Sequence, residues 1–193
     1  MSVETPEGVL TFWTQDLTES DWYATSTDLD ALITARFRET WEAAARGSLE
    51  HWRDCANGTL AYILVTDQFS RNMFRDDPRA FSTDPLALCA AKRGIAHGFD
   101  RRIAEPARQF CYMPLVHSEI TSDQERGVRM MLDRMPESGE SNLLHARAHR
   151  EVIRRYGRFP HRNDVLGRNT TALEQVYLED GAYGGIVRQL QAA

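Results

Sequence analysis

Apolar residues recur along most of this chain at intervals of three and four, which is the spacing of one face of an α-helix. In residues 28–46 they form one stripe, and Gly47 follows as a stop signal: Leu29, Leu32, Ile33, Phe37, Trp41 and Ala44. Residues 59–74 are the most apolar segment. A buried strand is an alternative there, but no breaker comes between the Asn57-Gly58 pair and Asp76, so we predict a long helix.

Boundary signals predict further helices along the chain. Thr5 and Pro6 open one, and another runs from Pro85 to Gly98. Pro114 should kink or break a helix that starts at Pro106. Two spacings predict capping boxes, namely Ser122 with Glu125 and Thr171 with Glu174.

These patterns contain no alternating strands, no linker and no low-complexity tract. We therefore predict an all-α protein. We expect a single domain over residues 1–193, with a core at about 6–179 and a frayed C-terminal tail at 180–193.

The richest polar stretch is residues 156–168, YGRFPHRNDVLGR, with the helix that leads into it. On that helix, His145 and His149 fall in the middle of the apolar side, so we predict that both are buried. Gly157 is placed to close the helix in the left-handed conformation. Pro160 forces Phe159 into an extended conformation, so the chain must leave the helix there.

Asp67 and Arg71 lie inside the apolar stripe of residues 59–74. They are four positions apart on the predicted helix, so they can form an ion pair. Such a buried pair costs several kcal/mol of desolvation per ion before attraction offsets it. Two interpretations follow, an internal pair that fixes helix packing and a pair that belongs to a functional site.

Composition narrows the class of protein. The net charge of −5 argues against a general nucleic-acid binder or a binder of anionic membranes. The three cysteines are widely spaced without a CxxC pair, which favours reduced thiols. The start, MSVETPEG, lacks the pattern of a secretory signal, and the longest apolar run, LAYILV, is far shorter than the ~20 residues of a membrane span. We therefore expect a soluble, cytoplasmic protein.

Arginine dominates the candidate chemistry, since only Lys92 among the 23 basic residues is a lysine. Guanidinium forks suit carboxylates and phosphates. We predict that two polar blocks converge on one pocket that binds a small anionic ligand or an acidic peptide end. Its candidate ligand-binding residues are Asp67, Arg71, Asn72, Arg75, His117, Glu119, His149, Arg158, His161, Arg162 and Asn163. The alternative is that these arginines tie loops to helix ends.

Two other function classes stay open. A metal-assisted hydrolase would use His117, Glu119 and His149, although the chain has neither an HExxH pattern nor clustered Cys/His spacing, so we assign no metal ligands and no cofactor. A protein-interaction scaffold would expose aromatic residues such as Trp22 or Trp52 along a groove. The sequence predicts neither catalytic residues nor an oligomeric state.

Four blocks carry a resemblance to a known family: DQFSRNMFR (67–75), PRAFSTD (78–84), YMPLVHSE (112–119) and YGRFPHRNDVLGR. They resemble the bacterial proteins grouped as domain-of-unknown-function family 924, from about Leu10 to Leu178. The resemblance implies an all-helical, tetratricopeptide-like fold of antiparallel helical pairs, but no activity. Thr66 and Ser70 stand where that family tends to have Leu and Pro. A repeat of about 34 residues is not visible in this sequence.

Overall fold

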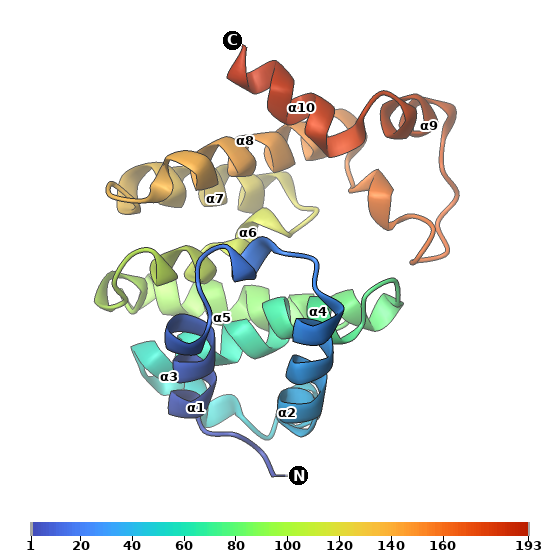
Figure 1. Ribbon diagram of the computed structural model, residues 1–193. Coiled ribbons are helices and arrows are strands. Elements are labelled where there is room, and N and C mark those ends of the chain that lie inside the picture. Colours follow the sequence, from blue (N-terminus) through green and yellow to red (C-terminus); the bar gives the residue numbers. More distant parts are fainter. Residues whose placement is uncertain (1, 193) are drawn as a thin grey trace. The chain divides into compact units, whose positions relative to one another are not determined.

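The computed structural model describes residues 2–192, and every regular element in that range is helical (Figure 1). The all-α prediction is therefore confirmed. The chain divides into two compact units, Met1–Pro114 and Leu115–Ala193. The single domain expected from the sequence stays a prediction.

The first unit contains five α-helices among its described residues: α1 (Pro6–Thr11), α2 (Thr27–Ala45), α3 (Ala56–Ile63), α4 (Ser70–Met73) and α5 (Asp84–Ala96). Helix α1 starts as predicted, because the Thr5 side chain accepts a hydrogen bond from the Gly8 amide and Pro6 opens the first turn. Helix α2 ends before Gly47, whose φ of 78° is the left-handed conformation expected there. Helix α3 packs against α1 and α5.

The apolar segment predicted as one long helix is helical throughout, but a π-helical turn, Leu64–Phe69, joins α3 to α4. It also begins earlier than predicted, since Asn57 and Gly58 lie inside α3. The reason is the close approach of the preceding turn. A Cβ atom on Gly58 would lie 2.1 Å from the Trp52 carbonyl oxygen, so glycine acts here as a contact residue and not as a helix breaker.

The core of the first unit is aromatic. Phe69 lies between Phe37 and Trp13, with ring centroids 4.5 and 5.3 Å away, and Phe110 packs edge-on against Trp13 at 5.6 Å. Each of these rings is almost fully buried, which stabilises the fold by roughly 1.5–3 kcal/mol per side chain. This core fixes the π-helical turn that carries Asp67.

The second unit contains α7 (Thr121–Arg134), α8 (Gly139–Tyr156), α9 (Ala172–Glu179) and α10 (Ala182–Gln191), and the short α6 (Met113–Val116) spans the boundary. Helices α7 and α8 form a hairpin joined by residues 135–138. The tail at 180–193 was predicted to fray, yet residues 182–191 form α10, which packs on α8. Its apolar residues Tyr183, Ile186 and Val187 have helical spacing, and their burial overcomes the glycines at 181, 184 and 185.

Several predicted boundaries can be compared with the structure. The Thr171–Glu174 capping box is present. The Ser122–Glu125 box is not, because α7 begins at Thr121 with Ile120 in the cap position, and Glu125 instead pairs with Arg150 at 3.1 Å. The predicted break near Pro114 is confirmed: a 3-10 turn, Ala107–Cys111, and α6 replace one continuous helix.

Candidate functional site

The arginines of the first polar block, residues 67–75, are held by carboxylates of the first unit. Arg71 Nη1 lies 3.2 Å from Oδ1 of the fully buried Asp67, so the predicted ion pair is confirmed. Arg71 also donates to both oxygens of Asp84, at 3.0 and 3.1 Å. This arrangement fixes the π-helical turn and α4 to the start of α5.

Arg75 and Asn72 share one carboxylate. Arg75 binds Asp30 through two hydrogen bonds of 2.7 and 2.8 Å, and Asn72 Nδ2 donates to the same Asp30 at 2.8 Å. A forked contact of this kind satisfies a guanidinium group geometrically and electrostatically. These contacts fit the structural alternative for the first block.

In the second unit, Arg158 and Asn163 also contact a carboxylate. Arg158 donates to both oxygens of Glu174, at 2.6 and 2.8 Å, and Asn163 Nδ2 lies 3.4 Å from Glu174 Oε2. The hydrogen bonds from Arg158 lower the pKa of Glu174 to about 2. The same carboxylate accepts from the Thr171 amide in the capping box. Arg158 and Asn163 therefore organise the loop before α9.

Glu119 has a similar role. Its Oε1 atom accepts from the Phe159 amide at 2.9 Å and from Arg168 Nη1 at 2.8 Å. These contacts hold the extended residue Phe159 in place after Gly157, whose φ is 71° as predicted. Glu119 thus positions the polar stretch against the segment that follows α6.

Around Phe159 the remaining predicted residues of the second unit do converge. The Arg162 guanidinium lies 4.5 Å from the centroid of the Phe159 ring, and the His149 and His161 rings lie 5.5 and 5.6 Å from it. His117 joins the group through His149, with ring centroids 6.1 Å apart, and its carbonyl accepts from Arg162 Nη2 at 3.2 Å. We call these five residues the Phe159 cluster.

The members of the Phe159 cluster come from three segments of different exposure. His149 comes from α8, His117 follows α6, and His161 and Arg162 come from the 3-10 turn Pro160–Arg162. Arg162 is only 7% exposed, whereas the His161 side chain is exposed. The cluster therefore combines a buried guanidinium group with a histidine that solvent can reach.

His149 is neutral in this setting. Burial, with a smaller contribution from the nearby His117, lowers the pKa of His149 to about 3. Its Nδ1 atom lies 2.8 Å from the His145 carbonyl oxygen, so Nδ1 carries the hydrogen and Nε2 is left as an acceptor. His149 is half-buried as part of the apolar side of α8. His145 is exposed and lies 2.7 Å from the Tyr183 hydroxyl, so its predicted burial was wrong.

This geometry gives little support to the two alternatives, a metal-assisted hydrolase and a protein-interaction scaffold. Among the described residues, no group of three or more His, Cys, Asp and Glu side chains is arranged to hold a metal ion. Trp52 is buried, and Trp22 stacks on Trp13 while its Nε1 donates to the Trp13 carbonyl at 2.8 Å. Neither tryptophan is the exposed aromatic residue that a scaffold groove would display.

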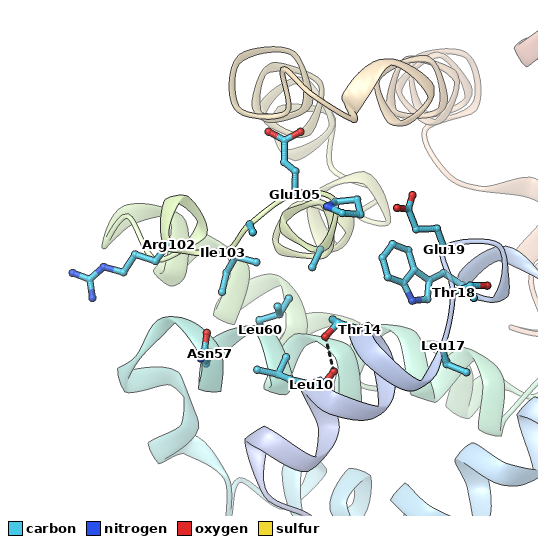
Figure 2. A pocket seen from close by; sticks show the side chains of 14 residues that line it. Leu10, Thr14, Leu17, Thr18, Glu19, Asn57, Leu60, Arg102, Ile103 and Glu105 are labelled. Carbon is cyan, nitrogen blue, oxygen red and sulfur yellow. Dashed lines mark hydrogen bonds between the residues drawn. The ribbon is translucent and has the colours of Figure 1, made fainter.

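A cavity of about 560 Å³ in the first unit was not predicted. Figure 2 shows Leu10, Leu60 and Ile103 facing it, whereas Arg102 and Glu105 point away from these apolar side chains. Its lining comes from three separate stretches, residues 10–22, 57–60 and 102–107, so no local sequence pattern predicts it. The cavity has apolar walls without converging charged groups, and we assign it no ligand.

The fold and the Phe159 cluster define a small, all-helical protein whose arginines are mostly paired and whose imidazoles gather beside one buried arginine. The chain belongs to the family described as bacterial protein of unknown function (DUF924), which matches residues 9–182. The resemblance noted in the sequence is thus confirmed.

A solved structure supports the same assignment. The chain is similar to ATU0120, a protein of unknown function from Agrobacterium tumefaciens, with 37% sequence identity and a TM-score of 0.85. The match covers 91% of this chain and 97% of that chain. No match was found among curated proteins. The tetratricopeptide-like character of the fold stays a prediction. In the described part of the chain, none of the helices combines the length and apolar character needed to cross a membrane.

Proposed function

We propose that the protein binds a small anionic ligand, or the acidic end of a peptide, at the Phe159 cluster. The observation that carries this proposal is the convergence of His117, His161 and Arg162 beside His149 within one compact unit. The buried arginine concentrates positive potential, and the imidazoles beside it can donate N–H hydrogen bonds, which favours a carboxylate or a phosphate.

The electrostatics of Glu119 agree with this proposal. Although partial burial opposes it, the hydrogen bonds from Arg168 and the Phe159 amide, together with the charges of Arg168 and Arg162, lower the pKa of Glu119. One carboxylate thus faces two guanidinium groups. An additional anionic oxygen beside Arg162 and His161 would be stabilised by the same groups.

His149 adds a second element of specificity. Its Nε2 atom is an acceptor, so it favours a ligand that offers an O–H or N–H group next to its anionic oxygens. Hydrogen phosphate has an O–H group as well as anionic oxygens, whereas sulfate has only acceptor oxygens at neutral pH. We therefore expect phosphate to bind more tightly than sulfate.

The other predicted residues have supporting roles in this proposal. Arg158, Asn163 and Glu119 hold the backbone around Phe159. Asp67, Arg71, Asn72 and Arg75 belong to the first unit, and a contribution from them to the same pocket stays a prediction.

Thermal denaturation in phosphate, sulfate and chloride at matched ionic strength tests the proposal. Phosphate should raise the melting temperature in a saturable way, since a ligand at a hundredfold excess over its Kd stabilises the folded state by about 2.7 kcal/mol. Chloride at matched ionic strength reports general screening.

His161→Gln should abolish the phosphate effect without unfolding the protein, because His161 is exposed. His97→Gln is the matched control, since His97 is also exposed and packs against a phenylalanine, Phe99, at 5.5 Å. Equal stabilisation by all three salts, or an unchanged phosphate effect in His161→Gln, would show that the cluster does not bind anions.

A further inference from the structure

Helix α10 brings one hydroxyl group to the edge of the Phe159 cluster, and the proposed function makes no use of it. The ring of Tyr183 packs against that of His149, with ring centroids 4.7 Å apart. The Tyr183 hydroxyl oxygen lies 3.2 Å from Nδ1 of His149 and 2.7 Å from Nδ1 of His145, one turn earlier on α8. A single hydroxyl group of α10 thus lies between two imidazole nitrogens.

The backbone of α8 determines where the hydrogens of these three side chains lie. Nδ1 of His149 is 2.8 Å from the carbonyl oxygen of His145, which can only accept, so this nitrogen carries a hydrogen. The Tyr183 hydroxyl therefore cannot donate to His149. It donates to Nδ1 of His145 at 2.7 Å, since the other acceptor in reach, the His145 carbonyl, is 3.4 Å away. The hydrogen bonds thus run in one direction, from His149 through Tyr183 to His145.

Desolvation keeps the three groups in the protonation states that this chain of hydrogen bonds requires. It raises the pKa of Tyr183, so the hydroxyl keeps its hydrogen near neutral pH. It lowers the pKa of His145 below the usual value of 6.5, and the pKa of His149 is lowered to about 3. Both imidazoles are therefore neutral at pH 7.5, and Nδ1 of His145 is free to accept from the hydroxyl group.

The Tyr183 hydroxyl influences the other nitrogen of the His149 ring. The Tyr183 oxygen and the His145 carbonyl oxygen are two acceptors that stabilise the hydrogen on Nδ1 of His149, so Nε2 stays an acceptor. Hydrogen bonds in a chain polarise one another, and an imidazole whose N–H group is hydrogen-bonded is a stronger base at its second nitrogen. Without the hydroxyl group, the carbonyl alone would hold the hydrogen, and Nε2 would be a weaker acceptor.

We propose that Tyr183 is a positioning residue of the anion site, and that through it α10 sets the preference of the site for anions that carry an O–H group. The inference rests on the proposed function. Tyr183 does not touch the ligand and acts through His149, whose Nε2 accepts a hydrogen bond from the ligand. The class that this arrangement favours is hydrogen phosphate and other hydroxyl-bearing anions, in preference to anions with acceptor oxygens only.

Isothermal titration with phosphate and with sulfate at pH 7.5 tests this role, because both are mainly dianions and they differ in the O–H group. Tyr183→Phe keeps the ring beside His149 and removes only the hydroxyl group. It should weaken phosphate binding about threefold, near the lower end of what one hydrogen bond contributes, because the His145 carbonyl still holds the hydrogen on Nδ1. Sulfate binding should stay unchanged, which also shows that the variant is folded.

Two further variants control the comparison. Tyr177→Phe is the matched control, since Tyr177 is a buried tyrosine of the same unit whose hydroxyl has no hydrogen-bond partner among the described residues. It should leave the affinities for both anions unchanged. His145→Ala removes the acceptor of the Tyr183 hydrogen at an exposed position. That hydrogen then competes for the carbonyl of residue 145, so phosphate binding should weaken while sulfate binding does not.

Nitrogen NMR shifts of the His149 ring give a readout that a loss of packing alone would not move. In the wild-type protein without ligand they should show the hydrogen on Nδ1. In Tyr183→Phe the tautomer with the hydrogen on Nε2 should become more populated, because one of the two acceptors that oppose it is gone. Tyr177→Phe should give the wild-type shifts.

The possible failures are distinguishable. An unchanged ratio of phosphate to sulfate affinity in Tyr183→Phe, or an equal loss of both affinities, would overturn the role of Tyr183 and leave the proposed anion site in place. Unchanged NMR shifts of His149 in that variant would overturn the role as well. If the wild-type protein bound neither anion saturably, the proposed anion site would be wrong, and this inference would be wrong with it.

Discussion

The two units each contain a histidine, a phenylalanine and an arginine in contact, and they use them differently. In the first unit, His97 and Arg102 lie 5.5 and 5.8 Å from the Phe99 ring, and both are exposed. In the second unit, Arg162 lies 4.5 Å from Phe159 and both residues are buried. The same residue types thus form a solvated surface contact in one unit and a desolvated cationic cluster in the other.

The difference comes from the backbone and from the neighbouring helices. The left-handed Gly157 and the extended Phe159 bring the turn that carries Arg162 back beside His149 of α8. Around Phe99, Arg102 remains on the surface. The cation–π interaction with a nearby ring stabilises a solvated charge only slightly. It stabilises a desolvated charge more, and such a charge also needs hydrogen-bonding or ionic partners. We therefore expect ligand chemistry at Phe159 and not at Phe99.

The first polar block provides the sharpest contrast with the Phe159 cluster, and it should show the largest effect. Arg71→Met should cost about 3–5 kcal/mol of unfolding free energy, because it leaves the buried Asp67 without its partner in the ion pair. The double variant with Asp67→Leu should cost less than the sum of the single changes. Urea denaturation of the four proteins measures this coupling, and additive losses would show that the pair does not interact.

The pKa of His149 gives the second prediction. Above pH 6.5 its imidazole is neutral in both the folded and the unfolded chain, so it adds no pH dependence. Between pH 6.5 and about 3 the unfolded chain binds a proton that the folded chain does not, so stability falls as the pH falls. The slope from this group is at most about 1.4 kcal/mol per pH unit.

His149→Gln should remove that part of the decline. Unfolding free energies at pH 7.5 and at pH 5.5 measure it, and the wild-type protein should lose more stability between them than the variant. Parallel losses would mean that His149 is not desolvated in the folded protein.

Substitutions of Arg162 beside Phe159 and of Arg102 beside Phe99 test the comparison of the two sites directly. Arg162→Met should cost about 1.5–3 kcal/mol, because it removes a charged donor from the His117 carbonyl and a desolvated contact with Phe159. Arg102→Met should change stability by no more than about 0.5 kcal/mol, as expected of an exposed site. Thermal denaturation measures the loss of stability in both variants, and equal losses would show that the Phe159 cluster and the Phe99 contact do not differ in this respect.

The smallest effect is expected at the Thr171 cap, whose partner Glu174 also pairs with Arg158, as carboxylates pair with the arginines of the first block. Thr171→Ala should cost about 1 kcal/mol, since it removes the cap of α9. Ser122→Ala is the matched control, because the capping box predicted there is absent. A similar loss in both variants would indicate that the Thr171 hydroxyl is not acting as a cap.

Local rules predicted much of the fold from the sequence. The stripe of α2, the left-handed Gly157, the Thr171 cap and the Asp67–Arg71 pair all depend on residues at most four or five positions apart. Helix α10 was missed because its glycines resemble breakers, while its stability depends on packing against α8. Helix propensity alone predicts the wrong structure for this segment, because tertiary contacts determine its stability.

The candidate site was predictable only in part, for a related reason. Arg75 pairs with Asp30, 45 positions away, and Arg158 pairs with Glu174, 16 positions away. No spacing rule connects such residues, so the sequence could identify the arginines but not their partners. A groove of about 320 Å³ in the second unit could not be predicted either, because its lining comes from three helices, α8, α9 and α10.

Glu174 joins several parts of the second unit through one carboxylate. It accepts from Arg158 and from the Thr171 amide, and Asn163 lies close to it, so it links the end of α8, the following loop and the start of α9. The first turn of α9 cannot fray without also releasing Arg158. Residues 158–174 should therefore open and close as one cooperative foldon, which makes this part of the surface a two-state element instead of a loop with graded mobility.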